Sequence, residues 1–320
     1  MTKLGKKTQA VYPEGVYVAP PKSLLKYVLT NKWLYILLVP ALLYVLVYNY
    51  LPMFGIVIAF QDFKSVDSIW NSEFIGFDNF KILFESEEFY QVFYNSVALS
   101  FLNLIFGFPF PIILAILLNE VRQDLFKRFV QTVSYLPHFI SWVVIAGMLI
   151  NYLDSQGPIN FIIEKLGGEQ ILFLQDPRYF RGVIVVANIW KGCGWSSIIY
   201  LAALSNLDQQ VYEAALIDGA NRFQRIVHIT FPGILTTIVT VLILNMGTVM
   251  NNGFEQIYLL SNSLNAEVSE VFETYTYKIG IVKGDFGFST AVGLFKSLVS
   301  FILVMTTNFI SRKIGKKGLW

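Results

Sequence analysis

The chain has 320 residues, of which 55% are hydrophobic and only 14% are charged. With a mean hydropathy of +0.55, this composition excludes an ordinary soluble enzyme and indicates a protein that crosses a membrane several times. The net charge of +2 comes with no basic and aromatic patch of the kind that binds nucleic acid. The single cysteine, Cys193, lies in an apolar run, which excludes a disulfide framework and a cysteine-based metal site.

Six apolar runs are long enough to cross a lipid bilayer. A hydrocarbon core about 30 Å thick needs roughly 20 apolar residues per helix. The runs that meet this length are 34–60, 95–118, 132–153, 182–204, 234–258 and 289–311. We therefore predict an all-α membrane protein with six transmembrane helices over 34–311. An N-terminal tail with a basic surface helix (1–33) precedes them, and a basic tail (312–320) follows.

The distribution of Lys and Arg predicts the orientation in the membrane. These residues are roughly twice as frequent in the two tails and in the loops around Arg122 and Arg222 as in the remaining loops, and basic residues favour the cytoplasmic side. Both termini and the loop 205–233 are therefore predicted to be cytoplasmic. We interpret the N-terminus as a tail and not as a removed signal peptide, because no small-residue cleavage site closely follows the first long apolar run.

The loop between the fourth and fifth runs has the pattern of two short helices that meet at a bend. Val211, Ala214 and Ala215 recur at helical spacing, and Gly219 supplies a left-handed residue that can end such a helix. Asn221 can then cap a second short helix. A polar helical segment between two long apolar runs is a part of a membrane protein that another protein can bind.

The same loop resembles the "EAA" loop of the membrane permeases of binding-protein-dependent ABC importers. That pattern is Glu-Ala-Ala, three residues, Gly, nine residues, Ile, one residue, a hydrophobic residue and Pro. The matching positions are Glu213, Ala214, Ala215, Gly219, Ile229, Phe231 and Pro232, with Phe231 where the family usually has Leu. The resemblance implies a type I ABC importer permease fold. It also implies a coupling element that sits in a groove of a partner ATPase, with the residues Glu213, Ala214, Ala215, Asp218, Gly219, Ala220 and Pro232.

Two further stretches resemble branches of the same family that handle sugars. The aromatic segment 74–80 is similar to a pattern of the sugar permeases. The segments 119–120, 127–131 and 135–142 resemble the branch for complex carbohydrates, which handles aldouronates, alginate-type and other oligosaccharides. The resemblance thus implies one subunit of an oligosaccharide importer in the bacterial cytoplasmic (inner) membrane. Its implied partners are a second homologous permease, two ATP-binding subunits and an extracytoplasmic solute-binding protein.

Energy for transport is expected to come from those partner chains. The sequence has no Gly-x-x-x-x-Gly-Lys-Ser/Thr phosphate loop. We therefore expect no cofactor in this chain, with ATP and Mg²⁺ bound by the partner ATPase. No metalloprotease motif or nucleophile elbow indicates catalysis either, so the chain is predicted to be a transport subunit and not an enzyme.

Two lysines within the apolar runs need a physical explanation. A lysine in the membrane costs roughly 2.5–3.5 kcal/mol on insertion scales, so it usually faces a cavity, a partner charge or an interface. Trp190 and Trp195 flank Lys191, and aromatic rings can stack on the apolar faces of sugars. One interpretation is that these residues line the translocation cavity. The alternative is interfacial tryptophans with a structural ion pair, and Lys296 in the sixth run is open to the same two interpretations.

Amide side chains suggest a second part of a substrate pathway. Asn245, Asn252 and Gln256 are seven and four residues apart, so in one continuous helix they would share a face. That face can contact a hydroxyl-rich substrate, or the amides can join helices to one another. Glu255 is a candidate partner for a membrane lysine. We interpret His138 as a hydrogen-bonded histidine in the bundle, with a proton relay or ligand as the alternative.

Other assignments remain open at this point. The outer segment 259–288 can be a docking surface for the receptor or a plain solvated loop. A self-sufficient ion-coupled transporter would need carboxylates at mid-membrane and often two related halves, and the sequence offers little beyond Glu255. An ABC permease for a non-sugar solute is a further alternative. Lys191 and Lys296 could favour an acidic sugar, although specificity in this class is largely set by the receptor.

Overall fold

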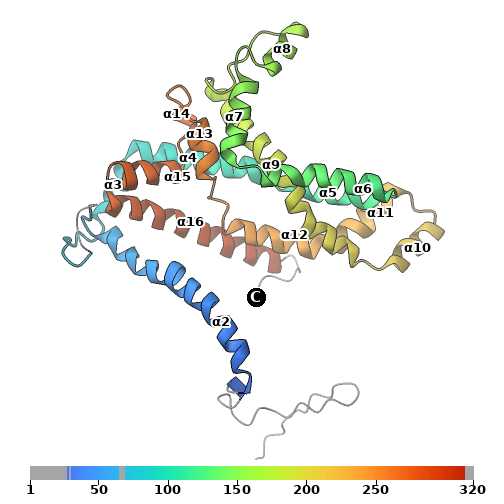
Figure 1. Cartoon of the computed structure of the whole chain (residues 1–320), viewed down its shortest axis with the longest axis horizontal. Coiled ribbons are helices and arrows are strands. Elements are labelled where there is room, and N and C mark those ends of the chain that lie inside the picture. Colours follow the sequence, from blue (N-terminus) through green and yellow to red (C-terminus); the bar gives the residue numbers. More distant parts are fainter. Residues whose placement is uncertain (1–26, 29, 65–68, 314–320) are drawn as a thin grey trace, which may run out of the picture. The chain divides into compact units, whose positions relative to one another are not determined.

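The computed structural model describes residues 27–28, 30–64 and 69–313, and all regular elements in these ranges are helices (Figure 1). The chain divides into two units, residues 1–55 and residues 56–320. Most of the predicted N-terminal tail and the end of the C-terminal tail lie outside the described residues. The all-α prediction is confirmed for the part that is described.

The first unit contributes one long apolar helical segment. It consists of α2 (Lys32–Val45) and the wider turn η1 (Leu46–Tyr50), and it continues as the tighter helix η2 (Leu51–Phe60) into the second unit. No residue of α2 or η1, both described in full, is buried. A helix that is apolar on all sides is suited to contact lipid or other apolar protein surfaces.

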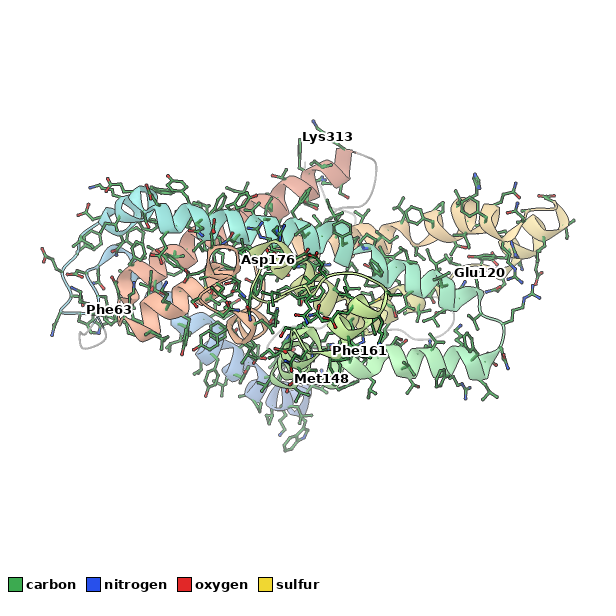
Figure 2. All side chains as sticks on the ribbon, turned by 90° about the horizontal axis from the view of Figure 1, so that it is seen from above. Phe63, Glu120, Met148, Phe161, Asp176 and Lys313 are labelled. Atoms are coloured by element: carbon green, nitrogen blue, oxygen red, sulfur yellow. The ribbon has the colours of Figure 1, made fainter. Side chains whose placement is uncertain are left out.

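The second unit is a helical bundle whose elements are joined by short turns. In chain order they are α3 (Asp78–Glu85), α4 (Glu87–Leu102), η3 (Asn103–Gly107), α5 (Pro109–Glu120), α6 (Asp124–Tyr135), η4 (Leu136–Phe139), α7 (Trp142–Leu153), α8 (Pro158–Lys165), α9 (Pro177–Ser205), α10 (Gln209–Ile217), α11 (Arg222–Arg225), η5 (Ile226–Thr230), α12 (Phe231–Met246), α13 (Phe254–Leu260), α14 (Ala266–Ser269), α15 (Phe272–Thr276), η6 (Tyr277–Val282) and α16 (Phe286–Lys313). In the bundle α9 packs against α5 and α6, and α12 packs against α16. Phe63 and Glu120 mark opposite ends of this unit (Figure 2).

The described residues contain six helical segments long and apolar enough to cross a membrane when a bent pair of helices is counted as one. The five continuous segments are Lys32–Phe60, Glu87–Glu120, Pro177–Ser205, Arg222–Met246 and Phe286–Lys313. The sixth consists of Asp124–Phe139 and Trp142–Lys165, which meet at an angle of 99°. The predicted number of spans is confirmed, but two boundaries are wrong. The run 132–153 is not one helix, and the run 234–258 stops being helical after Met246.

Three of the spans contain a widened turn directly before a proline. The turns η1, η3 and η5 end two residues before Pro52, Pro109 and Pro232 respectively. A proline ring clashes with the carbonyl group four residues earlier and provides no N–H for it. A wider helical turn moves that carbonyl group away. At Pro52 the distortion therefore occurs as a change of helix type.

The segment after the fifth span is packed into the core and is not a plain solvated loop, so that interpretation of 259–288 is wrong. Phe272 and Tyr275 are almost completely buried with Phe89 and Phe288 in one cluster. Phe272 contacts Phe89 of α4 at 6.2 Å and Phe295 of α16 at 6.3 Å between ring centroids. Aromatic pairs in this geometry contribute about 0.5–1.5 kcal/mol beyond their buried area, so this segment is held firmly against α4 and α16.

A cluster of salt bridges around Lys278 also joins the segment after the fifth span to α4. The Lys278 ammonium lies 3.0 Å from a Glu88 carboxylate oxygen and 3.2 Å from one of Glu270. Burial lowers the pKa of Lys278, but the hydrogen bonds from the two carboxylates raise it by more, so its pKa lies above the ordinary value. Lys278 therefore stays charged throughout the physiological range and joins η6 to the start of α4.

Candidate functional site

A cavity of about 900 Å³ lies within the second unit between the α4–α5 segment, α9 and the end of α12. Most of its polar side chains are amides and hydroxyls. The polar and aromatic residues that line it include Ser100, Asn103, His138, Trp142, Asn188, Lys191, Trp195, Ser196, Asn245, Thr248, Asn251, Asn252 and Gln256. Among the lining residues, all of them described, Lys191 is the only one with a formal charge and none is a carboxylate. Such a wall can donate and accept many hydrogen bonds, as a hydroxyl-rich ligand requires.

Lys191 binds the backbone at the break in the third span. The short helix η4 ends at Phe139, Ile140 is extended, and Ser141 begins α7 by accepting a hydrogen bond from the Val144 N–H. From α9, the Lys191 ammonium donates to the carbonyl groups of Pro137 at 3.4 Å, His138 at 3.0 Å and Ile140. An ammonium has three N–H donors. Carbonyl groups thus take the place of the ion pair that was one interpretation of Lys191.

Two aromatic side chains form a stacked pair on the cavity wall. The rings of His138 and Trp195 are parallel to within 1°, with centroids 4.5 Å apart, and Phe139 packs edge-on against Trp195. Trp195 remains 45% exposed. Trp195 thus lines the cavity, where its role as a stacking surface for sugar stays a prediction, and the participation of His138 was missed. The only sequence signal for it is the aromatic density of the segment 135–142.

The three amides of the fifth run line the cavity but do not share one helix face. That expectation is wrong because α12 ends at Met246 and the chain turns before α13 begins at Phe254. Gly253 makes this turn possible with a φ of 84°. Asn245, on the last turn of α12, is exposed and lines the cavity.

The other two amides hold the turn in place. Asn252 donates to the Ser96 carbonyl at 3.1 Å and accepts a hydrogen bond from the Ser100 hydroxyl at 3.2 Å. Gln256 donates to the Asn252 carbonyl at 2.8 Å. Both amides are more than nine-tenths buried. Asn252 therefore joins segments of the chain, which was one of the two predicted roles, while Asn245 is available to a ligand.

Two of the candidate pathway residues lie outside this cavity. Trp190 lines a separate apolar pocket of about 640 Å³ between α7 and α9. Lys296 pairs with Glu273 at 2.6 Å, and the two side chains are only 20% and 15% exposed. Glu255, the partner suggested from the sequence, is exposed. For Lys296 the structural ion pair is the correct interpretation.

The helix–bend–helix hairpin predicted around Glu213 is confirmed. It comprises α10, the turn at Gly219 and α11, and Figure 1 shows it at the end of the unit where α5 and α6 meet. Gly219 has a φ of 79°, and Asn221 forms a reciprocal capping box with Gln224. Tyr212 ties α10 to the base of α12 through a 2.9 Å hydrogen bond to Thr230.

The surface of the hairpin is exposed and includes two large apolar side chains. α10, which is described in full, has no buried residue. Glu213, Ala214 and Asp218 are exposed. Ile217 is 87% exposed and Phe223 is 73% exposed. Sequence reasoning did not select Ile217 and Phe223 as site residues, although two apolar residues flanking a glycine turn in a polar loop are a usable signal for a docking surface.

Comparison with known proteins identifies the family. A family model described as "Binding-protein-dependent transport system inner membrane component" matches residues 107–316. The chain belongs to this family. The permease is thus a membrane-spanning transport subunit of an ABC importer and not an enzyme. This assignment confirms the predicted resemblance and decides against the self-sufficient ion-coupled transporter.

Relatives of the permease match over almost its whole length. Protein LplB of Bacillus subtilis (strain 168) is 49% identical over 291 residues, which cover 91% of this chain and 92% of LplB. The polygalacturonan/rhamnogalacturonan transport system permease protein YteP of the same organism is 46% identical over 300 residues, covering 93% and 94% of the two chains. A chain of a bacterial alginate ABC transporter, crystallised in complex with an alginate pentasaccharide-bound periplasmic protein, superposes with a TM-score of 0.85. It is 38% identical, and the match covers 92% of the permease and 99% of that chain.

Proposed function

We propose that this permease moves oligosaccharides across the membrane, and that it accepts sugars with uronic-acid units. The observation that carries the proposal is the composition of the cavity wall, with amides, hydroxyls and a stacked His138–Trp195 surface. Sugars present hydroxyl groups around their rings and apolar C–H faces above and below them, which suit these two kinds of surface. The volume of about 900 Å³ is in the range of pockets that take drug-sized ligands.

The electrostatics of the wall favour acidic over basic substrates. No carboxylate lines the cavity, and Lys191 contributes the one formal charge among the lining residues. A negatively charged sugar therefore meets no like charge there, whereas a cationic substrate would. The names of YteP and of the alginate transporter associate those relatives with acidic polysaccharides, which supports the same substrate class for this chain.

The hairpin at Glu213 is the proposed contact with the energy source. It is exposed and preorganised by its caps, and it has apolar residues on its surface. We infer that an ATP-binding subunit, which would hold ATP and Mg²⁺, contacts the hairpin through Glu213, Ala214, Ala215, Asp218, Gly219 and Ala220. Pro232 begins the span that would transmit movements of that subunit to the bundle. A second homologous permease, two such ATPases and an extracytoplasmic binding protein complete the proposed importer, with both permease termini on the cytoplasmic side.

The test is ATP hydrolysis by the complex that co-purifies with this chain, reconstituted with its binding protein. We expect both neutral and uronic-acid oligosaccharides to stimulate hydrolysis. Trp195→Ala should raise the half-stimulating sugar concentration by about five- to tenfold, because an aromatic contact contributes about 1 kcal/mol. Trp190→Ala, outside the cavity, is the matched control and should leave that concentration unchanged.

Three results would contradict the proposal. If no ATPase co-purifies, the interpretation of the hairpin is wrong. If hydrolysis responds to no oligosaccharide, the substrate class is wrong. If neutral sugars stimulate and uronic acids do not, the acidic part of the proposal fails while the sugar part stands.

A further inference from the structure

At the break in the third span, the Pro137 carbonyl accepts a hydrogen bond from the Ile140 N–H at 3.2 Å, and the carbonyl groups of His138 and Ile140 have no backbone donor among the described residues. The last carbonyl groups of any helix lack an N–H donor four residues ahead. Within a membrane protein such groups are satisfied by other protein groups or by water in a cavity. Here the chain turns by 99°, and the carbonyl groups of Pro137, His138 and Ile140 point to the Lys191 ammonium.

We propose that Lys191 is a positioning residue that pins this break to α9 and thereby holds the His138–Trp195 stack in the cavity wall. The proposal rests on the proposed function, in which this wall contacts the sugar. His138 and Trp195 belong to separate segments, one at the break and one on α9. Their parallel alignment therefore depends on how the break is fixed to α9. Lys191, four residues before Trp195 on the same helix, makes that connection.

A second contact on the same side of α9 fixes the part of the span that precedes the break. Gly194 lies three residues after Lys191, so the two share a helix face. A Cβ atom at Gly194 would lie 2.0 Å from the Ser134 carbonyl oxygen of α6, so α6 and α9 approach as closely as a glycine permits. On the other side of the break, the Lys191 ammonium lies 5.4 Å from the ring centroid of Trp142 at the start of α7. α9 thus contacts α6 before the break and α7 after it.

The hydrogen bonds of Lys191 distinguish a positioning role from direct binding of an acidic sugar. All three donors of the ammonium face carbonyl oxygens, and the ion pairs found among the described residues do not involve Lys191. A substrate carboxylate would have to displace a carbonyl group to gain a hydrogen bond. Loss of Lys191 should therefore impair every sugar alike, whereas loss of a direct ligand would impair acidic sugars selectively.

Cys193 provides a native reporter for the state of the break. It is the only cysteine of the chain and is half-buried. It lines both the cavity and a groove that α9 forms with Ser134 and Pro137. If the break separates from α9, this groove opens and the thiol reacts faster with a maleimide. The labelling rate can be measured on this chain by mass spectrometry, without any sugar present.

The experiment compares the wild type with Lys191→Met and Lys191→Arg in the complete complex, with Val186→Ala on α9, which lines neither the cavity nor the groove, as the control. Lys191→Met should lower the maximal uptake of neutral and uronic-acid sugars by about tenfold and accelerate Cys193 labelling by a similar factor, since one hydrogen bond to a charged group already corresponds to about that change. The KM should rise by a similar factor for neutral and for uronic-acid sugars, because both lose the aligned stack and no contact specific to a carboxylate is removed. Lys191→Arg, which keeps a charged donor group, should restore both readouts toward the wild type.

Two outcomes would overturn the inference. One is wild-type Cys193 labelling in Lys191→Met. The other is a rise in KM for uronic acids alone, which would make Lys191 a direct ligand. If Lys191→Met does not accumulate in the membrane, Lys191→Gln replaces it, and unchanged labelling there has the same meaning. If the wild-type complex transports neither sugar, the proposed function fails, while the labelling comparison still decides the role of Lys191.

Discussion

The two membrane lysines show how differently one residue type can be satisfied within the same bundle. Lys191 uses backbone carbonyl groups that a broken helix leaves free. Lys296 uses the carboxylate of Glu273, which comes from the packed segment after the fifth span. The second Glu273 oxygen is buried without a hydrogen-bond partner. Lys296 and Glu273 thus form an ion pair with little access to solvent. Removing either side chain would leave the charge of the other uncompensated.

At the residue scale we predict strong coupling between Lys296 and Glu273. Lys296→Met or Glu273→Gln alone should lower the free energy of unfolding by about 3–5 kcal/mol, because removing one partner leaves a buried uncompensated charge. The double variant should regain most of this loss. Thermal unfolding of the purified complex measures the three variants against the wild type. Additive losses in the double variant would show that the two side chains do not interact.

The hairpin of α10 and α11 is stabilised almost entirely by its own local contacts. Asp208 caps α10 and the Asn221–Gln224 capping box starts α11. Gly219 makes the bend with a positive φ, and no other group lies within 4 Å of the place where its Cβ would be. The element can therefore keep its shape while it projects from the bundle, which suits a rigid contact with another subunit.

At the element scale we predict that a negative charge at the bend uncouples transport from ATP hydrolysis. Gly219→Asp adds a charge beside Asp218 on the exposed surface of the hairpin. Gly219→Asn is the matched control, because Asn and Asp both tolerate a positive φ and have nearly the same shape. We expect both variants to reach the membrane, with sugar-stimulated hydrolysis lost only in the Asp variant. Normal sugar-stimulated hydrolysis in both variants would mean that the bend tolerates charge and is not the docking surface.

The whole molecule covers little of its own apolar surface. In each of the five continuous spans, at most 28% of the most apolar stretch is buried within this chain, and in the first span none is. Large apolar residues such as Phe129 and Phe301 remain more than half exposed. Lipid or another protein chain would cover such surfaces. They suit the subunit of an ABC importer that the family assigns.

At the scale of the whole molecule we predict that the hairpin and α8 lie on opposite sides of the membrane. In a Cys193→Ala background, Glu164→Cys on α8 should react with a membrane-impermeant maleimide in spheroplasts. Asp218→Cys in the hairpin should react only after the membrane is permeabilised. Both side chains are exposed, and the chain is expressed without the ATP-binding subunits, so access to the reagent depends on the membrane alone. Labelling of both in intact spheroplasts would disprove the predicted orientation.

The sequence by itself determined the features that depend on neighbouring residues. The apolar runs predicted the six spans because a bilayer demands a minimum length of apolar helix. The hairpin was predictable in detail because caps and left-handed turns act within a few residues, as at Gly219 and Asn221. The family resemblance followed from the same loop, whose spacing is continuous in the chain.

The tertiary structure alone decided the features that depend on distant segments. Lys191 meets a carbonyl group 54 residues earlier, and Lys296 meets a carboxylate from another element, so neither partner can be found from local pattern. The breaks near Ile140 and after Met246 occur within apolar runs whose sequence predicts continuous helices. They persist because side chains from other helices satisfy the backbone groups that the breaks leave free, as Lys191 does at the first of them.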